Sequence, residues 1–212
     1  YNVVHGFGPD SAGEFLTRHP DVDGITFTGE TRTGEAIMKA AAEGIRPVSM
    51  ELGGKNAAVV FADCDLQVTI DTLQRSCFEN AGQVCLGTER VYVERPIFEQ
   101  VVAALKERAE AMTPGEPFDP ATRIGPVISK EHQGKVLSYY QKARQEGATV
   151  GTGGGVPDMP AHLKEGSWVQ PTIWTGLPET ASVITDEIFA PCCRISPFDS
   201  EEEVLSKVNA NR

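Results

Sequence analysis

The 212-residue sequence predicts an α/β fold built on parallel strands. In the first fifty residues, short strand-like runs alternate with stretches that have the residue preferences of helices. The alternation resumes after the glycine pair Gly53-Gly54 and continues through the rest of the chain. Parallel strands need long crossover connections, usually helices, so the order strand, helix, strand is typical of a parallel sheet. At roughly 100 to 200 residues per domain, this length allows one large domain or two modest ones.

The first part of the chain contains three strand signals, at residues 2–5, 24–28 and 47–51. Asp10 and Ser11 are good N-caps for a helix that follows the first of them. The alanine-rich segment 32–43 predicts a second helix, which Gly44 closes as the residue after the C-cap. Strands and helices are thus expected to alternate as in a parallel α/β unit.

The glycine pair interrupts this order, so we expect a domain boundary there, with one domain over residues 1–53 and a second over residues 54–212. The second part opens with an apolar strand over residues 56–61 and a helix that Asp65 caps. Apolar residues of this helix recur at spacings of four, three and four, which places them on one buried face. They are Leu66, Ile70, Leu73 and Cys77.

Further strand and helix signals complete the second part. A strand is expected over residues 91–94, helices over residues 98–112 and 129–146, and an amphipathic stretch over residues 201–208. The glycine-rich segment 151–155 and the residues that follow it to Gly166 are expected to form exposed turns, and the triple glycine matches no phosphate-binding loop.

Charge and composition exclude several functions. Asp and Glu outnumber Lys and Arg by 30 to 19, and without a basic stripe such a chain repels nucleic acids and anionic membranes. The longest apolar stretch, residues 57–62, is far shorter than the roughly 18 residues of a membrane span, and no signal-peptide pattern opens the chain. Five cysteines without a C-x-x-C pair indicate neither a disulfide framework nor a zinc site. We therefore expect a soluble, cytoplasmic protein without a metal site.

One cysteine stands in a setting that suits a nucleophile. Cys85 lies in the glycine-flanked run QVCLG at residues 83–87, outside the helical periodicity that precedes it. Backbone N–H groups at an irregular turn lower the pKa of a thiol and stabilise an oxyanion. A buried structural thiol is the alternative for Cys85. A structural role is expected for the other four cysteines, Cys64, Cys77, Cys192 and Cys193.

A carboxylate and a glycine-containing turn are further candidates. Glu51 ends the third strand, and the carboxyl ends of strands face the ligand crevice in open α/β sheets, so Glu51 is a candidate general base. A surface glutamate in an ordinary salt bridge is the alternative.

Residues 29–34, GETRTG, connect a strand to a helix, where free N–H groups favour an anion such as a pyrophosphate. A tight turn without a ligand explains the same residues.

Together, these residues resemble the NAD(P)-dependent aldehyde dehydrogenases. Four motifs carry the resemblance, in the order and with the approximate spacings of that family. They are Phe27-Thr28-Gly29 with Gly34, Glu51-Leu52-Gly53-Gly54-Lys55, Gly82-Gln83-x-Cys85, and Glu187-Ile188-Phe189 followed by Pro191. The likeness spans this chain but less than half of the family pattern. It implies the C-terminal part of a Rossmann-type NAD-binding domain over residues 1–53 and most of an α/β catalytic domain over residues 54–212.

The resemblance also implies a reaction. Cys85 would attack the aldehyde carbon to form a thiohemiacetal, and hydride would then pass to NAD. Glu51, 34 positions before Cys85, would activate the water that hydrolyses the resulting thioester. The two residues would thus serve as nucleophile and deacylation base.

Cofactor contacts are implied in the same way. Glu187 would hydrogen-bond the nicotinamide ribose, Phe189 would pack near the ring, and the backbone of Leu52 would contact the carboxamide. Gly29 and Gly34 would border the pyrophosphate.

Two positions depart from the family. Glu30 stands where many members have serine, and a carboxylate close to a pyrophosphate costs Coulomb energy unless it is paired, for which Arg32 is the candidate. Ala190 stands where glycine is usual and would narrow the approach of the backbone to the cofactor.

Within the family, the chain looks most like the muconic semialdehyde dehydrogenases, through CLGTERVYVERP from Cys85, GETRTG from Gly29 and ISKEH from Ile128. This likeness implies oxidation of 2-hydroxymuconate semialdehyde, of its 2-amino relative or of another aldehyde to the acid. The family's first cofactor-binding strands and its C-terminal segment have no counterpart here. The resemblance implies that the full-length protein is a homo-oligomer. Without the missing segments, we expect little or no activity from residues 1–212 alone. A non-catalytic remnant of the α/β core is the alternative.

Overall fold

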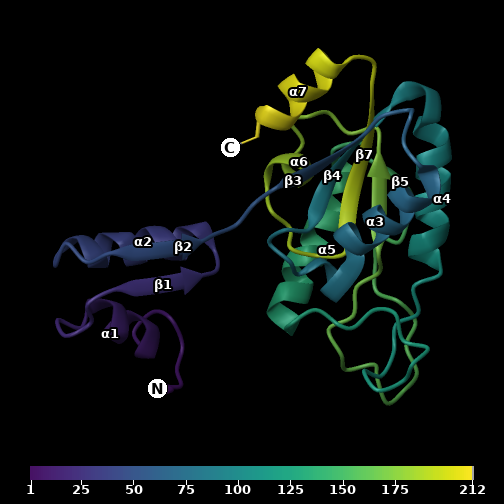
Figure 1. Ribbon diagram of the computed structural model, residues 1–212. Coiled ribbons are helices and arrows are strands. Elements are labelled where there is room, and N and C mark those ends of the chain that lie inside the picture. The colour runs from purple at the N-terminus through teal and green to yellow at the C-terminus, as the bar shows by residue number, and fades with distance from the viewer. Residues whose placement is uncertain (212) are drawn as a thin grey trace. The chain divides into compact units, whose positions relative to one another are not determined.

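The computed structural model describes residues 1–211, and the chain divides into two compact units, Tyr1–Gly53 and Gly54–Arg212 (Figure 1). The first unit contains helix α1 (Ala12–Arg18), strand β1 (Ile25–Thr28), helix α2 (Thr31–Ala42) and strand β2 (Val48–Glu51). Strands β1 and β2 are parallel neighbours, with Thr28 opposite Glu51. Because α2 crosses between them, this unit contains the strand–helix–strand arrangement that the sequence predicts.

The first unit differs from the prediction in two details. Residues 2–5 are exposed and form no strand, so that prediction is wrong. Among residues 1–211, no strand pairs with them to satisfy their backbone groups. Gly44 does follow the C-cap of α2, but the left-handed residue is Ile45, with a φ of 52°. Arg46 N then donates to Ala41 O at 3.0 Å and closes the helix end.

The second unit contains a five-stranded sheet in the order β3-β4-β7-β6-β5. Its strands are β3 (Asn56–Val60), β4 (Thr88–Glu94), β5 (Thr149–Thr152), β6 (Thr172–Thr175) and β7 (Cys192–Phe198). The β5–β6 pair is antiparallel and the other three pairs are parallel, so the predicted α/β fold with parallel strands is confirmed.

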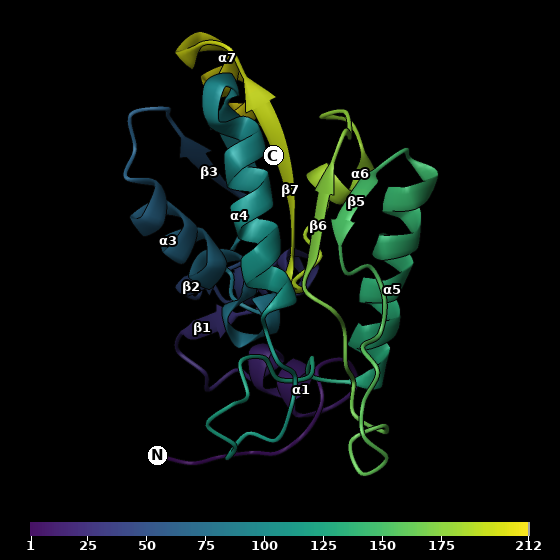
Figure 2. The ribbon, with the colours of Figure 1, turned by 90° about the vertical axis from the view of Figure 1, so that its right-hand side faces the viewer.

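Helices cover both faces of this sheet. They are α3 (Leu66–Phe78), α4 (Phe98–Glu110), α5 (Lys130–Gln145), α6 (Ser182–Thr185) and α7 (Glu201–Asn209), with 3₁₀ turns η1 (Glu79–Gly82) and η2 (Arg95–Ile97). Helices α3 and α4 pack against each other and against β4 and β7, which Figure 2 shows from the α4 side. Helix α7 covers the other face, where Val204 meets Tyr92 and Phe198.

The predicted apolar face of α3 is confirmed. Ile70, Leu73 and Cys77 are buried in the main core, and Leu66 packs against it. Asp65 caps the helix, since its side chain accepts a hydrogen bond from Val68 N at 3.1 Å. The local pattern therefore places this helix correctly before any long-range contact is known.

The glycine-rich segment 151–155 is not the exposed turn that the sequence predicts. Gly151 belongs to edge strand β5, and Gly154 is buried, with its N–H donating to Thr172 Oγ1 at 2.8 Å. Gly153 has a φ of 71°, and a Cβ at this position would lie 2.1 Å from Pro171 O. The glycines let β5 end in close contact with the chain beside β6, which local patterning did not show.

Across residues 1–211, no helix is long and apolar enough to cross a membrane. In the same residues, no cluster of three or more His, Cys, Asp or Glu side chains is arranged to hold a metal ion.

Candidate active site

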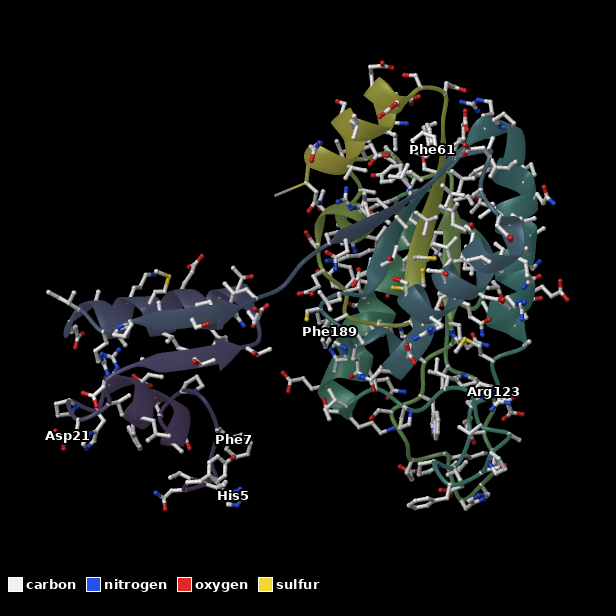
Figure 3. All side chains as sticks on the ribbon, viewed as in Figure 1. His5, Phe7, Asp21, Phe61, Arg123 and Phe189 are labelled. Carbon is white, nitrogen blue, oxygen red and sulfur yellow. The ribbon has the colours of Figure 1, made fainter. Side chains whose placement is uncertain are left out.

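In the second unit, the candidate site residues lie in the segments that lead into three neighbouring parallel strands. Gly54 precedes β3, Cys85 precedes β4, and residues 187–189 precede β7. Because these strands are adjacent and parallel, the segments before them meet at one end of the sheet. Figure 3 labels Phe189 at this end. We call it the N-terminal end of the sheet.

The segment between α3 and β4, residues 79–87, forms the loop that carries the nucleophile candidate, here called the thiol loop. Three consecutive residues have left-handed backbone angles, Asn80 (φ 52°), Ala81 (φ 54°) and Gly82 (φ 69°). Non-glycine residues adopt such angles only when their surroundings hold them there. Asn80 Nδ2 donates to Gln83 O at 3.1 Å, and Gln83 Oε1 accepts from Ile128 N at 2.9 Å. These bonds turn the chain sharply out of the helix.

Asn56 fixes the backbone on the C-terminal side of Cys85. Its Nδ2 donates to Cys85 O at 2.5 Å and to Gly87 O at 3.1 Å. Gly87 N donates to Val84 O at 2.8 Å, which closes a tight turn around the thiol. Among residues 1–211, the Cys85 N–H has no acceptor, and Cys85 itself is half-buried. The turn therefore offers a free backbone donor beside the thiol, as an oxyanion site requires.

The other thiols have different surroundings. Cys77, Cys192 and Cys193 are buried, whereas Cys64 is half-buried and packs against the core. Burial raises the pKa of Cys192 well above its ordinary value. The hydrogen bond with Cys77, together with burial, does the same to the pKa of Cys193. Cys192 and Cys193 therefore stay protonated near neutral pH, where a thiol is a poor nucleophile.

Gly82 marks the closest approach between the thiol loop and the segment before β7. A Cβ at this position would lie 2.0 Å from Ala190 O and 2.5 Å from Pro191 N, and the φ of 69° disfavours any side chain. We expect Gly82→Ala to lower the free energy of unfolding by at least about 2 kcal/mol, measured by urea denaturation.

Gly134→Ala is the matched control for this prediction. Gly134 lies inside α5, and a Cβ there would meet no heavy atom within 4 Å beyond the backbone of its own helix. This change should leave stability unchanged or raise it by about 0.5–1 kcal/mol, because alanine favours a helix over glycine. Equal effects of the two substitutions would contradict the close approach at Gly82.

The segment before β7 is held from several sides. Glu187 Oε1 accepts from Gly54 N at 3.1 Å. Phe189 has a left-handed φ of 61°; its N–H donates to Glu89 Oε1 at 2.9 Å, and His132 Nε2 donates to its carbonyl at 2.7 Å. Within residues 1–211, Glu187 Oε2 makes no hydrogen bond. One oxygen of this carboxylate therefore stays available to a ligand hydroxyl.

A buried ion pair lies behind these segments. The Lys55 ammonium contacts the Glu89 carboxylate, with side-chain exposures of 2% and 10%. Sequence reasoning assigned no role to Lys55, Glu89 or Asn56. Their only local signal is a polar side chain beside or within a short apolar strand.

In the first unit, predicted cofactor residues meet where β2 ends and α2 begins. Gly34 is buried in α2, and a Cβ there would lie 2.7 Å from Leu52 Cδ2. Gly29 N donates to Glu51 O at 3.0 Å. Glu51 is the exposed last residue of β2, so Glu51 belongs to the first unit and Cys85 to the second.

The expected partner of Glu30 is confirmed. Arg32 donates through a terminal guanidinium nitrogen to Glu30 Oε2 at 3.3 Å, and both side chains are exposed. The negative charge that Glu30 brings to the start of α2, where many family members have serine, is therefore paired with the Arg32 cation.

Comparisons with known proteins identify the family to which the chain belongs. A model described as the aldehyde dehydrogenase family matches residues 1–212, so the chain belongs to this family. A 2-hydroxymuconic semialdehyde dehydrogenase from Pseudomonas sp. (strain CF600) is 69% identical over 210 residues, which cover 99% of this chain and 43% of that protein. A 2-aminomuconic 6-semialdehyde dehydrogenase from Pseudomonas sp. is 56% identical over 212 residues, or 100% of this chain and 43% of that protein.

Solved structures share the fold. The NAD+ complex of an aldehyde dehydrogenase from Bacillus cereus matches with a TM-score of 0.92 and 38% identity, over 97% of this chain and 41% of that chain. A betaine aldehyde dehydrogenase from Staphylococcus aureus in complex with NAD+ has the same TM-score and 35% identity, over 97% and 40%. The aldehyde dehydrogenase fold is confirmed, and the chain spans about two fifths of the length of these relatives.

Proposed function

We propose that this chain is the part of an NAD-dependent aldehyde dehydrogenase that carries the nucleophile, Cys85, and the deacylation base, Glu51, and that its substrate is 2-hydroxymuconate semialdehyde. The observation that carries the proposal is that the thiol loop and residues 187–189 lead into neighbouring parallel strands, β4 and β7, at the N-terminal end of the sheet. Family membership supports the class of reaction. The relative that is 69% identical supports the substrate.

Cys85 acts on the aldehyde carbon. Its sulfur adds to the carbonyl, and the free Cys85 N–H stabilises the oxyanion of the thiohemiacetal that forms. When the carbon loses hydride, a thioester remains on Cys85. Asn56 keeps the backbone in place during these steps, because it holds the carbonyls of Cys85 and Gly87.

Glu51 completes the cycle. As a carboxylate at the exposed end of β2, it takes a proton from a water molecule, which then attacks the thioester carbon. The products are the carboxylic acid and the regenerated Cys85 thiol. Glu51 is needed only for this second half, so the two halves of the reaction separate experimentally.

The chemistry of the residues present fits NAD. When bound, this cofactor accepts the hydride. Glu187 keeps one carboxylate oxygen available for a ribose hydroxyl. Phe189, two residues later and half-buried, would supply the aromatic ring that packs near the nicotinamide. Gly29, Gly34 and the backbone of Leu52 would hold the pyrophosphate and the carboxamide at the turn into α2.

A hollow beside the thiol loop supports an anionic substrate. Its volume is about 350 Å³, and residues on both sides of Cys85 line it. The lining residues are Thr72, Arg75, Ser76, Glu79, Val84, Leu86 and Gly87. Arg75 is the cation in this set, and its exposed pair with Glu79, at 3.8 Å, is weak enough to be replaced by a substrate carboxylate.

We expect Arg75→Gln to lower kcat/KM for 2-hydroxymuconate semialdehyde by roughly tenfold, while a neutral aldehyde is oxidised as before, because only the anion loses an ion pair. Formation of NADH by the full-length protein, followed by absorbance, measures both. Arg108→Gln, on the neighbouring helix α4, is the matched control and should change neither value. A parallel loss with both aldehydes would contradict an anion-binding role for Arg75.

The same assay tests the substrate itself. The full-length protein should form NADH faster from 2-hydroxymuconate semialdehyde than from its 2-amino relative, which the 56%-identical relative makes the second candidate. A higher kcat/KM for the amino compound would replace the first assignment with the second. If the Cys85 thiol is reactive but the full-length protein forms no NADH from any aldehyde, the protein is a non-catalytic remnant.

A further inference from the structure

We infer that Lys55 and Glu89 are positioning residues that hold residues 187–189 in the conformation that binds NAD. This inference rests on the proposed function, because it assigns Glu187 and Phe189 to the cofactor. It adds two residues that act on the cofactor through residues 187–189, and it gives a reason for their burial.

Glu89 is at the centre of the arrangement. Its Oε1 accepts from Phe189 N at 2.9 Å, and its Oε2 accepts from Ile188 N at 3.1 Å and from the Lys55 ammonium. One buried carboxylate in β4 therefore binds two consecutive backbone N–H groups of the segment before β7. Hydrogen bonds of this kind, to an ionised acceptor, are about twice as strong as neutral ones.

The residue before Lys55 holds the side chain of Glu187. Gly54, the residue before Lys55, donates its N–H to Glu187 Oε1 at 3.1 Å. Lys55 O accepts from Arg90 Nε at 2.8 Å, which anchors this segment to β4. Gly54 thus binds the carboxylate of Glu187 directly. Lys55, the next residue, supports the backbone that follows Glu187 through its ion pair with Glu89.

The backbone of Phe189 shows that this support is needed. Its φ of 61° is a left-handed angle for a bulky residue, which costs roughly 1–3 kcal/mol. Glu89 binds its N–H and His132 binds its carbonyl, so both sides of the residue are held. Without Glu89, we expect this residue to relax and its ring to leave the position proposed for cofactor contact.

A buried ion pair is weak evidence for stability alone. The cost of removing two charges from water offsets much of their attraction. Apolar side chains of similar size in the same place often give a folded protein that is equally stable. The pair is therefore better explained by the directed hydrogen bonds of Glu89, which an apolar residue does not provide. The ammonium of Lys55 compensates the buried charge that these bonds require.

The test uses Lys55→Met and Glu89→Gln in the full-length protein. We expect the NADH dissociation constant, measured by fluorescence titration, and the KM for NAD to rise at least tenfold in both variants. The rate at which iodoacetamide alkylates Cys85 without cofactor should stay within about twofold of the wild type. Lys55→Arg, which keeps the charge, should restore most of the NADH affinity. Lys106→Met, in the exposed pair with Glu110, is the matched control and should bind NADH normally.

The outcomes separate this inference from the proposed function. Unchanged NADH affinity in Lys55→Met and Glu89→Gln would overturn the positioning role while the wild type remains an active dehydrogenase. A wild type that forms no NADH from any aldehyde would instead overturn the proposed function. If Lys55→Met does not fold, Glu89→Gln and Lys55→Arg decide, and a Glu89→Gln variant that folds and binds NADH normally refutes the inference.

Discussion

Cys85→Ala is expected to reduce aldehyde oxidation by the full-length protein by roughly a thousandfold or more. The substitution removes the sulfur atom that we propose forms the thiohemiacetal and the thioester, so neither half of the reaction would have its covalent intermediate. NADH formation with a saturating semialdehyde measures the loss. Since a Cβ remains and the loop is held through its backbone, the variant should fold and unfold like the wild type.

Cys64→Ala is the matched control. Cys64 is a half-buried thiol outside the thiol loop, and its loss should leave turnover within about twofold of the wild type. Labelling with iodoacetamide followed by mass spectrometry should identify Cys85 as the thiol that reacts first. Substantial turnover by Cys85→Ala would show that the nucleophile is another residue.

Glu51→Gln is expected to slow the second half of the reaction and leave the first half intact. The amide cannot take a proton from water, and loss of a general base typically costs 10²- to 10⁴-fold. A single burst of NADH should therefore precede a much slower steady state. Intact-mass spectrometry of the protein mixed with aldehyde and NAD should show the trapped acyl group on Cys85.

The control for this variant is Glu43→Gln. Glu43 follows the last residue of α2, whereas Glu51 lies near the start of that helix. Glu43 is an exposed carboxylate of the same unit, in a weak pair with Arg18, and its loss should change neither the burst nor the steady state. Absence of both the burst and the acyl adduct in Glu51→Gln would count against Glu51 as the deacylation base.

Features that depend on neighbouring residues along the chain were predictable. The spacing of Ile70, Leu73 and Cys77 specifies a helix with one buried face, and Asp65 has the side chain that its first turn needs. Strand–helix–strand alternation likewise predicts parallel pairing of β1 with β2. The strand expected at residues 2–5 fails for the complementary reason: an apolar run forms a strand only where a partner strand accepts its hydrogen bonds.

Motif residues were predictable to the same extent, as local signals. Cys85 stands out because the run around it breaks helical periodicity, and the structure explains the break by the left-handed turn at residues 80–82. The exposed turn predicted at residues 151–155 is wrong because Gly154 is buried against Thr172, which is distant in the sequence.

The sequence by itself determined the alternation of elements, the family resemblance and the candidates Cys85, Glu51 and Glu187. Only the tertiary structure decided that β7, the last strand in the chain, lies between β4 and β6, which brings the segment before β7 against the thiol loop at Gly82. The Lys55–Glu89 pair and the bond from Phe189 N to Glu89, 100 positions away, follow from that order. Periodicity and capping act over a few residues and are visible in the chain, whereas the neighbours of a strand are set by the packing of the whole sheet.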